Sequence, residues 1–439
     1  MYAVIGAGPM GLATARNLQK YNLPFVGFEL NKDVGGLWDI DNPHSTMYES
    51  AHLISSRHMT EFAEFPMAKD GAPYPHHSEL RRYFRDYAAH FGLYDHYRFN
   101  TRVVSVEPDG NGGWDVTSEK DGVEHRENFR GVLIANGTLN HPNMPELPGE
   151  FAGEVMHACD YRSPEVFADK RVLIVGCGNS ACDIAVDAVH RARAVDLSVR
   201  RGYYFLPKFI GGRPTDTLGG AIKLPRRLKQ RLDALLIKMV VGKPSDYGLP
   251  EPDYRMYESH PVINSLVLHH IGHGDIQPRR EIQSVDGHTV TFSTGESADY
   301  DLILMATGYH LHYPFIDQQH LNWNPGEGAP SLYLNIFNPK QDSLFVMGMI
   351  EAAGLGWEGR NEQAEMVALY IKQREAGRDS ATTLQNKIRQ FGGERLDGGY
   401  DYLDLERMAY YVHKDTYKQA IQTHIRELRR DLPANERPV

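Results

Sequence analysis

The residues with the clearest chemical potential lie at the start of the chain, in the segment GAGPMG. Gly6, Gly8 and Gly11 have the spacing of a loop that joins a strand to a helix and binds the pyrophosphate of a dinucleotide. The first glycine permits a tight turn, the second lets the backbone approach the phosphates, and the third lets helix and strand pack closely. Because a helix N-terminus also attracts phosphate, the loop predicts a nucleotide site that includes Pro9 and Met10.

Glu29 stands at the end of the next predicted strand, where the ribose of the nucleotide is expected. A carboxylate there accepts hydrogen bonds from the ribose hydroxyls and repels a 2′-phosphate, so the site favours FAD or NAD over NADP. The segment DVGGLWD follows, and alone it also fits a turn beside a buried tryptophan. Beside a dinucleotide loop, it predicts that the backbone at Gly36 approaches a ligand covered by Leu37 and Trp38. We assign these three residues and Val103 to the same cofactor site.

A second loop of the same kind occurs in the segment VGCGNSAC. Its small residues are Gly176, Gly178 and Ala181, and the side chains of Asn179 and Ser180 can donate hydrogen bonds to phosphate. Two such loops, each preceded by an apolar strand, indicate two dinucleotide-binding folds in one chain.

The strand after the second loop is followed by arginines in place of an acid, in the segment LSVRRG. Guanidinium groups match a 2′-phosphate in charge and in hydrogen-bonding geometry. Arg200 and Arg201 therefore predict NADPH at the second loop, although a solvated basic pair has the same sequence pattern.

Two of the three cysteines, Cys177 and Cys182, fall inside the second loop and have the spacing of a redox-active dithiol. Such a dithiol is expected downstream of the first loop, near a flavin ring, and no cysteine precedes Cys159. Free cysteines are also commonly small buried residues. We therefore favour an incidental pair over a catalytic one.

Composition narrows the class of protein. A net charge of −10 disfavours nucleic-acid binding. The low, odd cysteine count and the lack of an apolar leader predict a reducing, cytoplasmic setting. No apolar run approaches the ~20 residues of a membrane span, and we expect no metal site. A homodimer is the default expectation for an enzyme of this kind.

The alternation of strands and helices predicts an α/β fold with two dinucleotide-binding, Rossmann-like domains, the second inserted into the first. We place the first domain at residues 1–155 plus 310–439. The second domain covers residues 156–309, with a helical insertion at about 214–260. The segment FAGEVMHACDY spans the junction.

Residues 224–242 have an amphipathic pattern, with an apolar face formed by Leu228, Leu232, Leu235 and Met239. Two interpretations fit it: a helix that packs on its own domain or on a partner subunit, and a helix that lies on a membrane surface. We favour packing, because one amphipathic helix is the ordinary signature of a packed helix.

The junction segment has the pattern F-x-G-x-x-x-H-x-x-x-Y, through Phe151, Gly153, His157 and Tyr161. With both glycine loops, GGLW, SVRRG, YGL and ATGY, this pattern resembles the flavin-containing monooxygenases (class B flavoprotein monooxygenases) over nearly the whole chain. The final tyrosine distinguishes it from type I Baeyer–Villiger enzymes.

The resemblance implies that NADPH reduces FAD, that O₂ forms a C4a-hydroperoxyflavin, and that a soft nucleophile takes the distal oxygen: an amine nitrogen, a sulfide sulfur or indole. Thr307 and Gly308 of ATGY would contact cofactor. His157 would be a strut between domains and not a base. Gln363 would open a late helix near the flavin ring, where a helix N-terminus stabilises negative charge.

The sequence departs from the family pattern in the segment LISSRHMT, where Ile54 replaces an asparagine that contacts NADP⁺ and the hydroperoxide, and Ser55 follows. This replacement bears on which substrates the enzyme accepts and on how tightly NADPH consumption is coupled to product formation. Baeyer–Villiger oxidation of ketones, an NADPH oxidase that releases H₂O₂, a disulfide reductase and a nucleotide sensor are the alternatives, of which the last two are disfavoured. No sequence motif identifies the physiological substrate.

Overall fold

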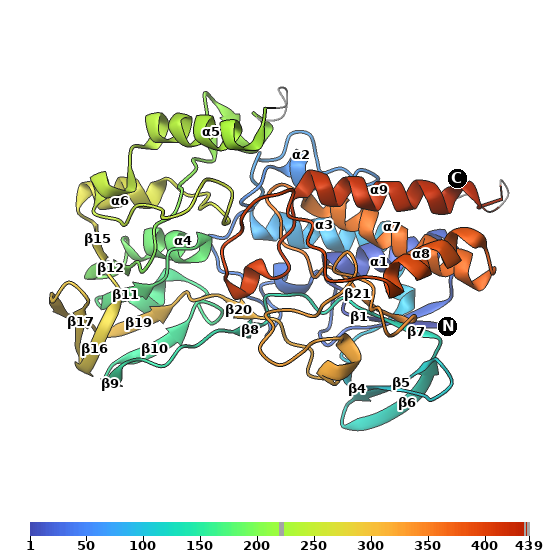
Figure 1. Ribbon diagram of the computed structural model, residues 1–439. Coiled ribbons are helices and arrows are strands. Elements are labelled where there is room, and N and C mark those ends of the chain that lie inside the picture. Colours follow the sequence, from blue (N-terminus) through green and yellow to red (C-terminus); the bar gives the residue numbers. More distant parts are fainter. Residues whose placement is uncertain (219–223, 434–435, 437–439) are drawn as a thin grey trace.

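The structure is a computed structural model that describes residues 1–218, 224–433 and 436. Two five-stranded sheets organise it, and every neighbouring pair of strands in both sheets is parallel. Figure 1 shows them in two lobes that meet near β8 (His141–Pro142) and β20 (Tyr309–His310), a short antiparallel pair. The predicted α/β class with two Rossmann-like domains is confirmed.

The first sheet has the strand order β21–β7–β1–β2–β3. Its strands are, in that order, Leu344–Val346, Gly131–Ile134, Tyr2–Ile5, Phe25–Phe28 and Tyr97–Arg98. The helices of this lobe are α1 (Pro9–Lys20), α2 (Arg57–Thr60), α3 (His77–His90), α7 (Gly356–Glu375), α8 (Asp379–Arg389) and α9 (Lys414–Arg430). α7 packs against both α1 and α9, and β21 pairs with β7, so the last part of the chain lies with the first sheet.

An antiparallel sheet, β4–β5–β6 (Arg102–Pro108, Trp114–Lys120 and Val123–Phe129), completes the first lobe. Trp114 is almost fully buried in the cluster beneath that sheet, and its indole N–H donates to the Ser343 hydroxyl at 3.0 Å.

The second sheet has the strand order β10–β19–β11–β12–β15. Its strands are, in that order, Glu154–His157, Leu302–Met305, Arg171–Val175, Ala194–Ser198 and Ile276–Arg279. An outer sheet is formed by β9 (Gly149–Phe151), β16 (Ile282–Gly287), β17 (Thr289–Phe292) and β18 (Ser297–Asp299). Because β9 already pairs with β16, the chain enters the second lobe at Gly149, earlier than the boundary expected at residue 156.

The helices of the second lobe are α4 (Asn179–Ala188), α5 (Arg226–Val241) and α6 (Leu266–His273). The two-stranded β13 (Phe209–Ile210) and β14 (Arg213–Pro214) precede α5. Short 3₁₀ turns lie at Gly36–Trp38, Leu93–His96, Pro164–Phe167, Thr215–Thr217, Pro244–Tyr247, Gln318–Leu321 and Glu406–Met408.

α5 differs from expectation in the direction of its apolar face. The four apolar residues expected to pack are exposed by 39–66%: Leu228, Leu232, Leu235 and Met239. Only Gln230 and Ile237 of this helix are buried. The prediction that the apolar face packs on its own domain is therefore wrong.

Candidate active site

One cavity of about 1490 Å³ connects the two lobes. It exceeds the roughly 300–1,000 Å³ of a pocket for one drug-sized ligand. The sequence-predicted residues that line it are Gly6, Gly8, Pro9, Met10, Glu29, Gly36, Leu37, Trp38, Ile54, Ser55, Val103, Asn179 and Ser180. The structure thus brings both glycine loops to one space.

The first loop has the geometry that its glycines predict. At Gly6, φ is +106°, and a Cβ atom would lie 2.5 Å from the carbonyl oxygen of Ala135. A Cβ at Gly11 would lie 1.9 Å from the carbonyl oxygen of Gly6, so this glycine serves helix–strand packing. Gly8 differs, because its φ is −71° and a Cβ would approach only Gly36 Cα, at 3.6 Å. α1 begins at Pro9 without a side-chain cap, so its first N–H groups are left for a ligand.

Glu29 is buried beside this loop, with 4% of its surface exposed. Its carboxylate accepts the Ala7 N–H at 2.6 Å and, on the other oxygen, the Asn31 backbone and side-chain N–H groups at 2.9 and 2.7 Å. Burial raises the pKa of the carboxyl, and these hydrogen bonds oppose that shift. A carboxylate has about four lone-pair sites, so one remains for a ribose hydroxyl.

Aromatic rings close the cavity beside the first loop. Trp38 meets Trp357 of α7 edge to face, with 6.1 Å between ring centroids. Both rings line the cavity, so they exclude water from the region where the first loop and the start of α7 converge.

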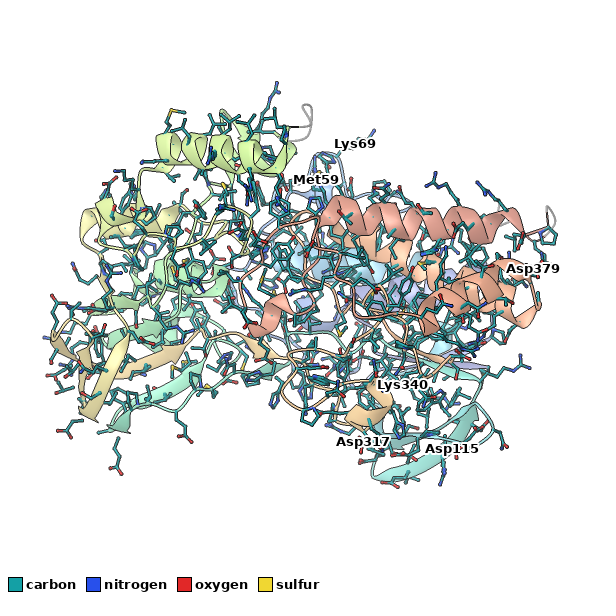
Figure 2. The ribbon with its side chains drawn as sticks, viewed as in Figure 1. Met59, Lys69, Asp115, Asp317, Lys340 and Asp379 are labelled. Carbon is teal, nitrogen blue, oxygen red and sulfur yellow. The ribbon has the colours of Figure 1, made fainter. Side chains whose placement is uncertain are left out.

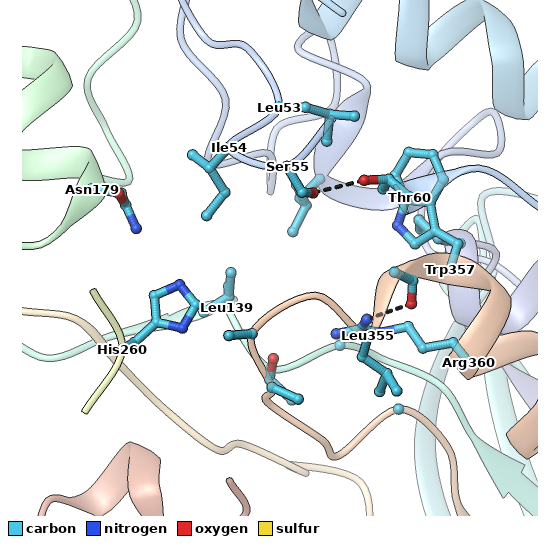
Figure 3. A pocket seen from close by; sticks show the side chains of 18 of the residues that line it. Leu53, Ile54, Ser55, Thr60, Leu139, Asn179, His260, Leu355, Trp357 and Arg360 are labelled. Atoms are coloured by element: carbon cyan, nitrogen blue, oxygen red, sulfur yellow. Dashed lines mark hydrogen bonds between the residues drawn. The ribbon is translucent and has the colours of Figure 1, made fainter. Parts of the chain in front are cut away.

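The second loop repeats the pattern of the first. At Gly176, φ is +123° and a Cβ would lie 2.4 Å from the Ala306 carbonyl oxygen, whereas Ala181 is fully buried in packing. At Gly178, a Cβ would meet no atom within 4 Å, so the backbone there is open to a ligand. The Asn179 Oδ1 accepts the Ile263 N–H at 2.7 Å, which fixes the amide and leaves its NH₂ group toward the cavity (Figure 3).

The two arginines after β12 have different environments, and neither lines the cavity. The Arg201 Nε donates to Asp253 at 2.6 Å, and its guanidinium lies 5.5 Å from the Tyr254 ring centroid. The Arg200 side chain is 75% exposed, and among the described residues it makes one ion pair, with Glu281, at 3.9 Å. Arg200 is therefore the one that a phosphate could recruit without breaking a short ion pair.

Thr307 and Gly308 lie between β19 and β20, outside the cavity lining. The Gly308 carbonyl accepts the His157 Nε2–H at 3.1 Å, while His157 Nδ1 accepts the Cys159 N–H at 3.1 Å. Both ring nitrogens are therefore used in one tautomer, and burial lowers the pKa of this histidine. These contacts fit a structural role and leave no nitrogen for acid–base chemistry.

The cysteine pair is buried in the core of the second lobe, where 3% of Cys177 and none of Cys182 is exposed. The two Sγ atoms are 4.0 Å apart, and both thiols are free. The neighbouring thiol and burial raise the pKa of Cys182 well above its usual value. A reactive dithiol needs an accessible thiolate, which this environment opposes.

Ile54 and Ser55 line the cavity from the segment before α2, as Figure 3 shows. The Thr60 hydroxyl donates to the Ser56 carbonyl at 2.8 Å, so the 2.7 Å contact between the Ser55 and Thr60 hydroxyls uses the hydrogen of Ser55. Neither the Ile54 side chain nor the Ser55 hydroxyl then offers a hydrogen-bond donor to the cavity.

The expected position of Gln363 is wrong. α7 begins at Gly356, so Gln363 lies two turns inside the helix, with none of its surface exposed. Its carbonyl oxygen accepts the Gly348 N–H at 2.8 Å, and its amide donates to the Tyr417 hydroxyl at 2.7 Å. The side chain is committed to packing α7 against α9, and the cavity is met by the first turn of α7 instead.

Many polar residues of the cavity were missed from the sequence, among them Arg360 and His260. Arg360 lies in the first turns of α7 and donates to the Gly356 and Ile350 carbonyls at 3.0 and 3.3 Å. No carboxylate lies within 4 Å of its guanidinium among the residues that the structure describes.

The His260 ring points into the cavity (Figure 3), with its Nδ1 3.3 Å from the Tyr411 hydroxyl. Burial lowers its pKa and favours the neutral ring. Neither Arg360 nor His260 belongs to a sequence motif, so only the fold identifies them.

The comparisons with known proteins now decide the class. The model of the flavin-binding monooxygenase-like family matches residues 1–400. The chain belongs to this family. It is 31% identical to flavin-containing monooxygenase 5 of Oryctolagus cuniculus, over 84% of this chain and 73% of that protein. It is also 30% identical to dimethylaniline monooxygenase [N-oxide-forming] 2 of Rattus norvegicus, over 90% of this chain and 77% of that protein.

Solved structures agree on the fold. A cyclohexanone monooxygenase in an open form has a TM-score of 0.70 at 17% identity, covering 100% of this chain and 98% of that one. The S-allyl-L-cysteine S-oxygenase of Allium sativum has a TM-score of 0.66 at 21% identity, covering 100% and 94%.

Membership confirms the expected enzyme class, a flavin-dependent monooxygenase. Flavin-containing monooxygenases use FAD and NADPH, so the two expected cofactors are confirmed with it. Among the described residues, no helix is long and apolar enough to cross a membrane, and no group of His, Cys, Asp and Glu is arranged to hold a metal ion.

Proposed function

We propose that this flavin-dependent monooxygenase transfers one oxygen atom of O₂ to a soft nucleophile: an amine nitrogen, a sulfide sulfur or the indole ring. The observation that carries the proposal is that α1 and α4, two helices without side-chain caps at their N-termini, both open onto one cavity. Two dinucleotides bound there would share one water-excluding space, as oxygen transfer at the expense of NADPH requires. The N-oxide-forming activity in the name of the rat relative supports nitrogen as an acceptor.

Each of the two glycine loops fits one of the two cofactors. The backbone N–H groups of Gly8 and Met10 would hold the FAD pyrophosphate, while Pro9, which has no N–H, starts the helix, and Glu29 would bind the ribose. Gly178, Asn179 and Ser180 would hold the pyrophosphate of NADPH, with Arg200 on its 2′-phosphate. When bound, FAD supplies electron transfer and the activation of O₂, chemistry that no side chain provides.

The remaining groups have positioning and electrostatic roles in this proposal. Arg360 places a positive charge at the N-terminal end of α7, where both the guanidinium and the helix dipole stabilise negative charge in the cavity. Trp38 and Trp357 exclude water. Ile54 makes the cavity wall apolar where the substrate would bind, which favours larger, more hydrophobic substrates over small amines.

A second candidate, an NADPH oxidase that releases H₂O₂, is favoured by one observation. The Ile54 side chain carries no donor, and the hydroxyl hydrogen of Ser55 is already used by Thr60. A polar group left without a partner in a dry site costs about 1–3 kcal/mol, enough to shorten the life of an oxygen-transferring state by roughly five- to a hundred-fold.

One experiment separates these candidates. The purified, FAD-loaded protein is given NADPH and air with N,N-dimethylaniline, methyl phenyl sulfide, indole or cyclohexanone, and NADPH loss, product and H₂O₂ are measured together. The proposal expects N-oxide or sulfoxide in near-equimolar amount to NADPH consumed. If cyclohexanone were the only compound oxidised, and gave a lactone, the enzyme would be a Baeyer–Villiger monooxygenase. If H₂O₂ formed without any oxygenated product, it would be an NADPH oxidase.

A further inference from the structure

The outer side of α5 is an apolar surface at the edge of the second lobe. Figure 1 shows the helix at the rim of the molecule, and Figure 2 shows side chains that project from it away from the body. Six of its apolar residues are 39–66% exposed: Leu228, Leu232, Leu235, Leu236, Met239 and Val240. We call these six residues the α5 apolar face. Single exposed leucines are ordinary, but a continuous exposed stripe along one helix marks an interaction site.

The helix turns its larger apolar stripe outward, while its inner side combines Gln230 and Asp233 with the buried Ile237, which packs with Leu206 and Met256. The Gln230 amide donates to the Met256 carbonyl at 2.9 Å and to Glu258 at 3.2 Å. The Tyr257 hydroxyl donates to Asp233 at 2.6 Å. A helix that only covers its own domain has the opposite orientation. These hydrogen bonds therefore hold the α5 apolar face outward.

Unpaired positive charge borders this face. α5 contains five basic residues and one acid, in a chain whose net charge is −10. Arg227, Arg231 and Lys238 are spaced by four and seven residues, so they lie on one flank of the helix. All three are exposed and have no ion pair with any residue that the structure describes. Exposed apolar side chains beside free cations are the pattern that an anionic lipid surface recognises.

We propose that α5 is a membrane-surface helix that docks the enzyme on anionic bilayers. The helix has 16 residues, about 24 Å at 1.5 Å per residue, and its basic residues keep it at the lipid–water boundary. Adsorption seats the α5 apolar face among acyl chains and the flanking cations among lipid phosphates.

A second copy of the chain fits the same surface less well. A helix about 24 Å long and about 10 Å wide offers about 240 Å² to a partner, whereas a standard interface buries about 800 Å² on each side. A two-fold pairing of two such helices also brings the basic flanks of both copies into one interface. Charge and area therefore both favour lipid.

Docking has a consequence for the cavity. Leu236 and Val240 belong to the α5 apolar face and also line the cavity, together with the buried Ile237. A bilayer beneath α5 would thus meet the apolar side of the cavity mouth. If the proposed function holds, hydrophobic amines and sulfides can enter from the lipid phase.

The test is co-sedimentation of the FAD-loaded protein with vesicles of phosphatidylcholine alone or with 30% phosphatidylglycerol. We expect binding to the anionic vesicles, weakening as salt is raised, and little binding to neutral ones. Each cation near an anionic surface contributes about five-fold to partitioning, so the triple variant Arg227→Gln/Arg231→Gln/Lys238→Gln should bind about a hundred-fold more weakly.

Matched controls remove the same charge and the same apolar surface elsewhere. Lys120, Arg193 and Lys340 are exposed and without ion pairs in the described parts of the chain, and their Gln triple variant should bind like the parent. Leu232→Ser/Leu235→Ser/Met239→Ser should lose binding. A Ser triple variant at Val123, Met144 and Val155, which are 54%, 46% and 39% exposed, should keep it.

The assay needs no turnover, so its result is independent of the proposed oxygen transfer. Flavin content and melting temperature show that each variant is folded. The proposal is overturned if anionic vesicles bind no more protein than neutral ones. It is equally overturned if sedimentation without lipid shows a dimer that the α5 Ser triple variant dissociates.

Discussion

Replacing Gly8 with alanine tests whether this glycine is needed for cofactor binding and not for folding. In the free protein the new Cβ would lie 3.6 Å from its nearest atom, an ordinary contact, and φ at this position is −71°. A glycine-to-alanine change that the backbone tolerates alters stability by about 0.4–1 kcal/mol through the unfolded chain. We therefore expect Gly8→Ala to leave the free energy of unfolding of the apoprotein within about 1 kcal/mol of the parent.

FAD binding should change far more. The methyl group would stand where the backbone meets the pyrophosphate, and a charge-assisted hydrogen bond contributes about 1.5–3 kcal/mol. Loss of one such bond raises the Kd for FAD by about ten- to a hundred-fold. Fluorescence titration of the apoprotein with FAD measures the Kd, and denaturant unfolding measures stability.

Gly178→Ala is the matched control at the second loop, where a Cβ would meet no atom within 4 Å. It should bind FAD normally and raise the KM for NADPH by a similar factor. The opposite control, Gly11→Ala, places a Cβ 1.9 Å from the Gly6 carbonyl oxygen and should impair folding itself. The assignment is refuted if Gly8→Ala binds FAD like the parent, or if Gly178→Ala is the variant that loses FAD.

Three further predictions concern the chemistry of the cavity and its surroundings. Arg200→Gln should raise the KM for NADPH by about ten- to a hundred-fold and leave the NADH kinetics almost unchanged; equal losses with both coenzymes in steady-state assays would contradict a 2′-phosphate contact. The Cys177→Ala/Cys182→Ala protein should reduce its flavin at a near-parental rate in anaerobic stopped flow, because both thiols are buried in the core of the second lobe; loss of flavin reduction while FAD and NADPH still bind would instead support a redox-active dithiol. Ile54→Asn returns a donor to the cavity wall and should lower the H₂O₂ released per NADPH by roughly five-fold or more; an unchanged ratio would show that the donor comes from elsewhere.

Local patterns predicted the strand–loop–helix units well. β1, α1 and β2 follow from an apolar run, a glycine turn and helical spacing within the first 28 residues. The same signals predicted β11, α4 and β12. The need for glycine could be predicted at Gly6, Gly11 and Gly176. A Cβ atom at each of these positions would clash with backbone atoms of the same loop or of an adjacent strand.

The errors arose where a side chain's direction depends on distant residues. Gln363 sits in the middle of α7 because that helix begins at Gly356, in a segment without a clear apolar period. The apolar spacing of α5 predicted a face but not its direction, which depends on hydrogen bonds that Gln230 donates to Met256 and Glu258 and that Asp233 accepts from Tyr257.

Arg360 and His260 reach the cavity from segments that carry no motif, and only the fold brings them there. The chain's entry into the second lobe at Gly149 likewise depends on the pairing of β9 with β16, more than 130 residues later. Such long-range pairing leaves no local signal in the sequence.

The most direct test of the central claim is the origin of the oxygen atom in the product. The FAD-loaded enzyme turns over NADPH and methyl phenyl sulfide under ¹⁸O₂ in unlabelled water, with catalase present to remove free H₂O₂, and the sulfoxide is analysed by mass spectrometry. Oxygen transfer within the shared cavity predicts one ¹⁸O atom per sulfoxide and about one product molecule per NADPH. Sulfoxide that carries ¹⁶O, or sulfoxide that disappears when catalase is added, would contradict it.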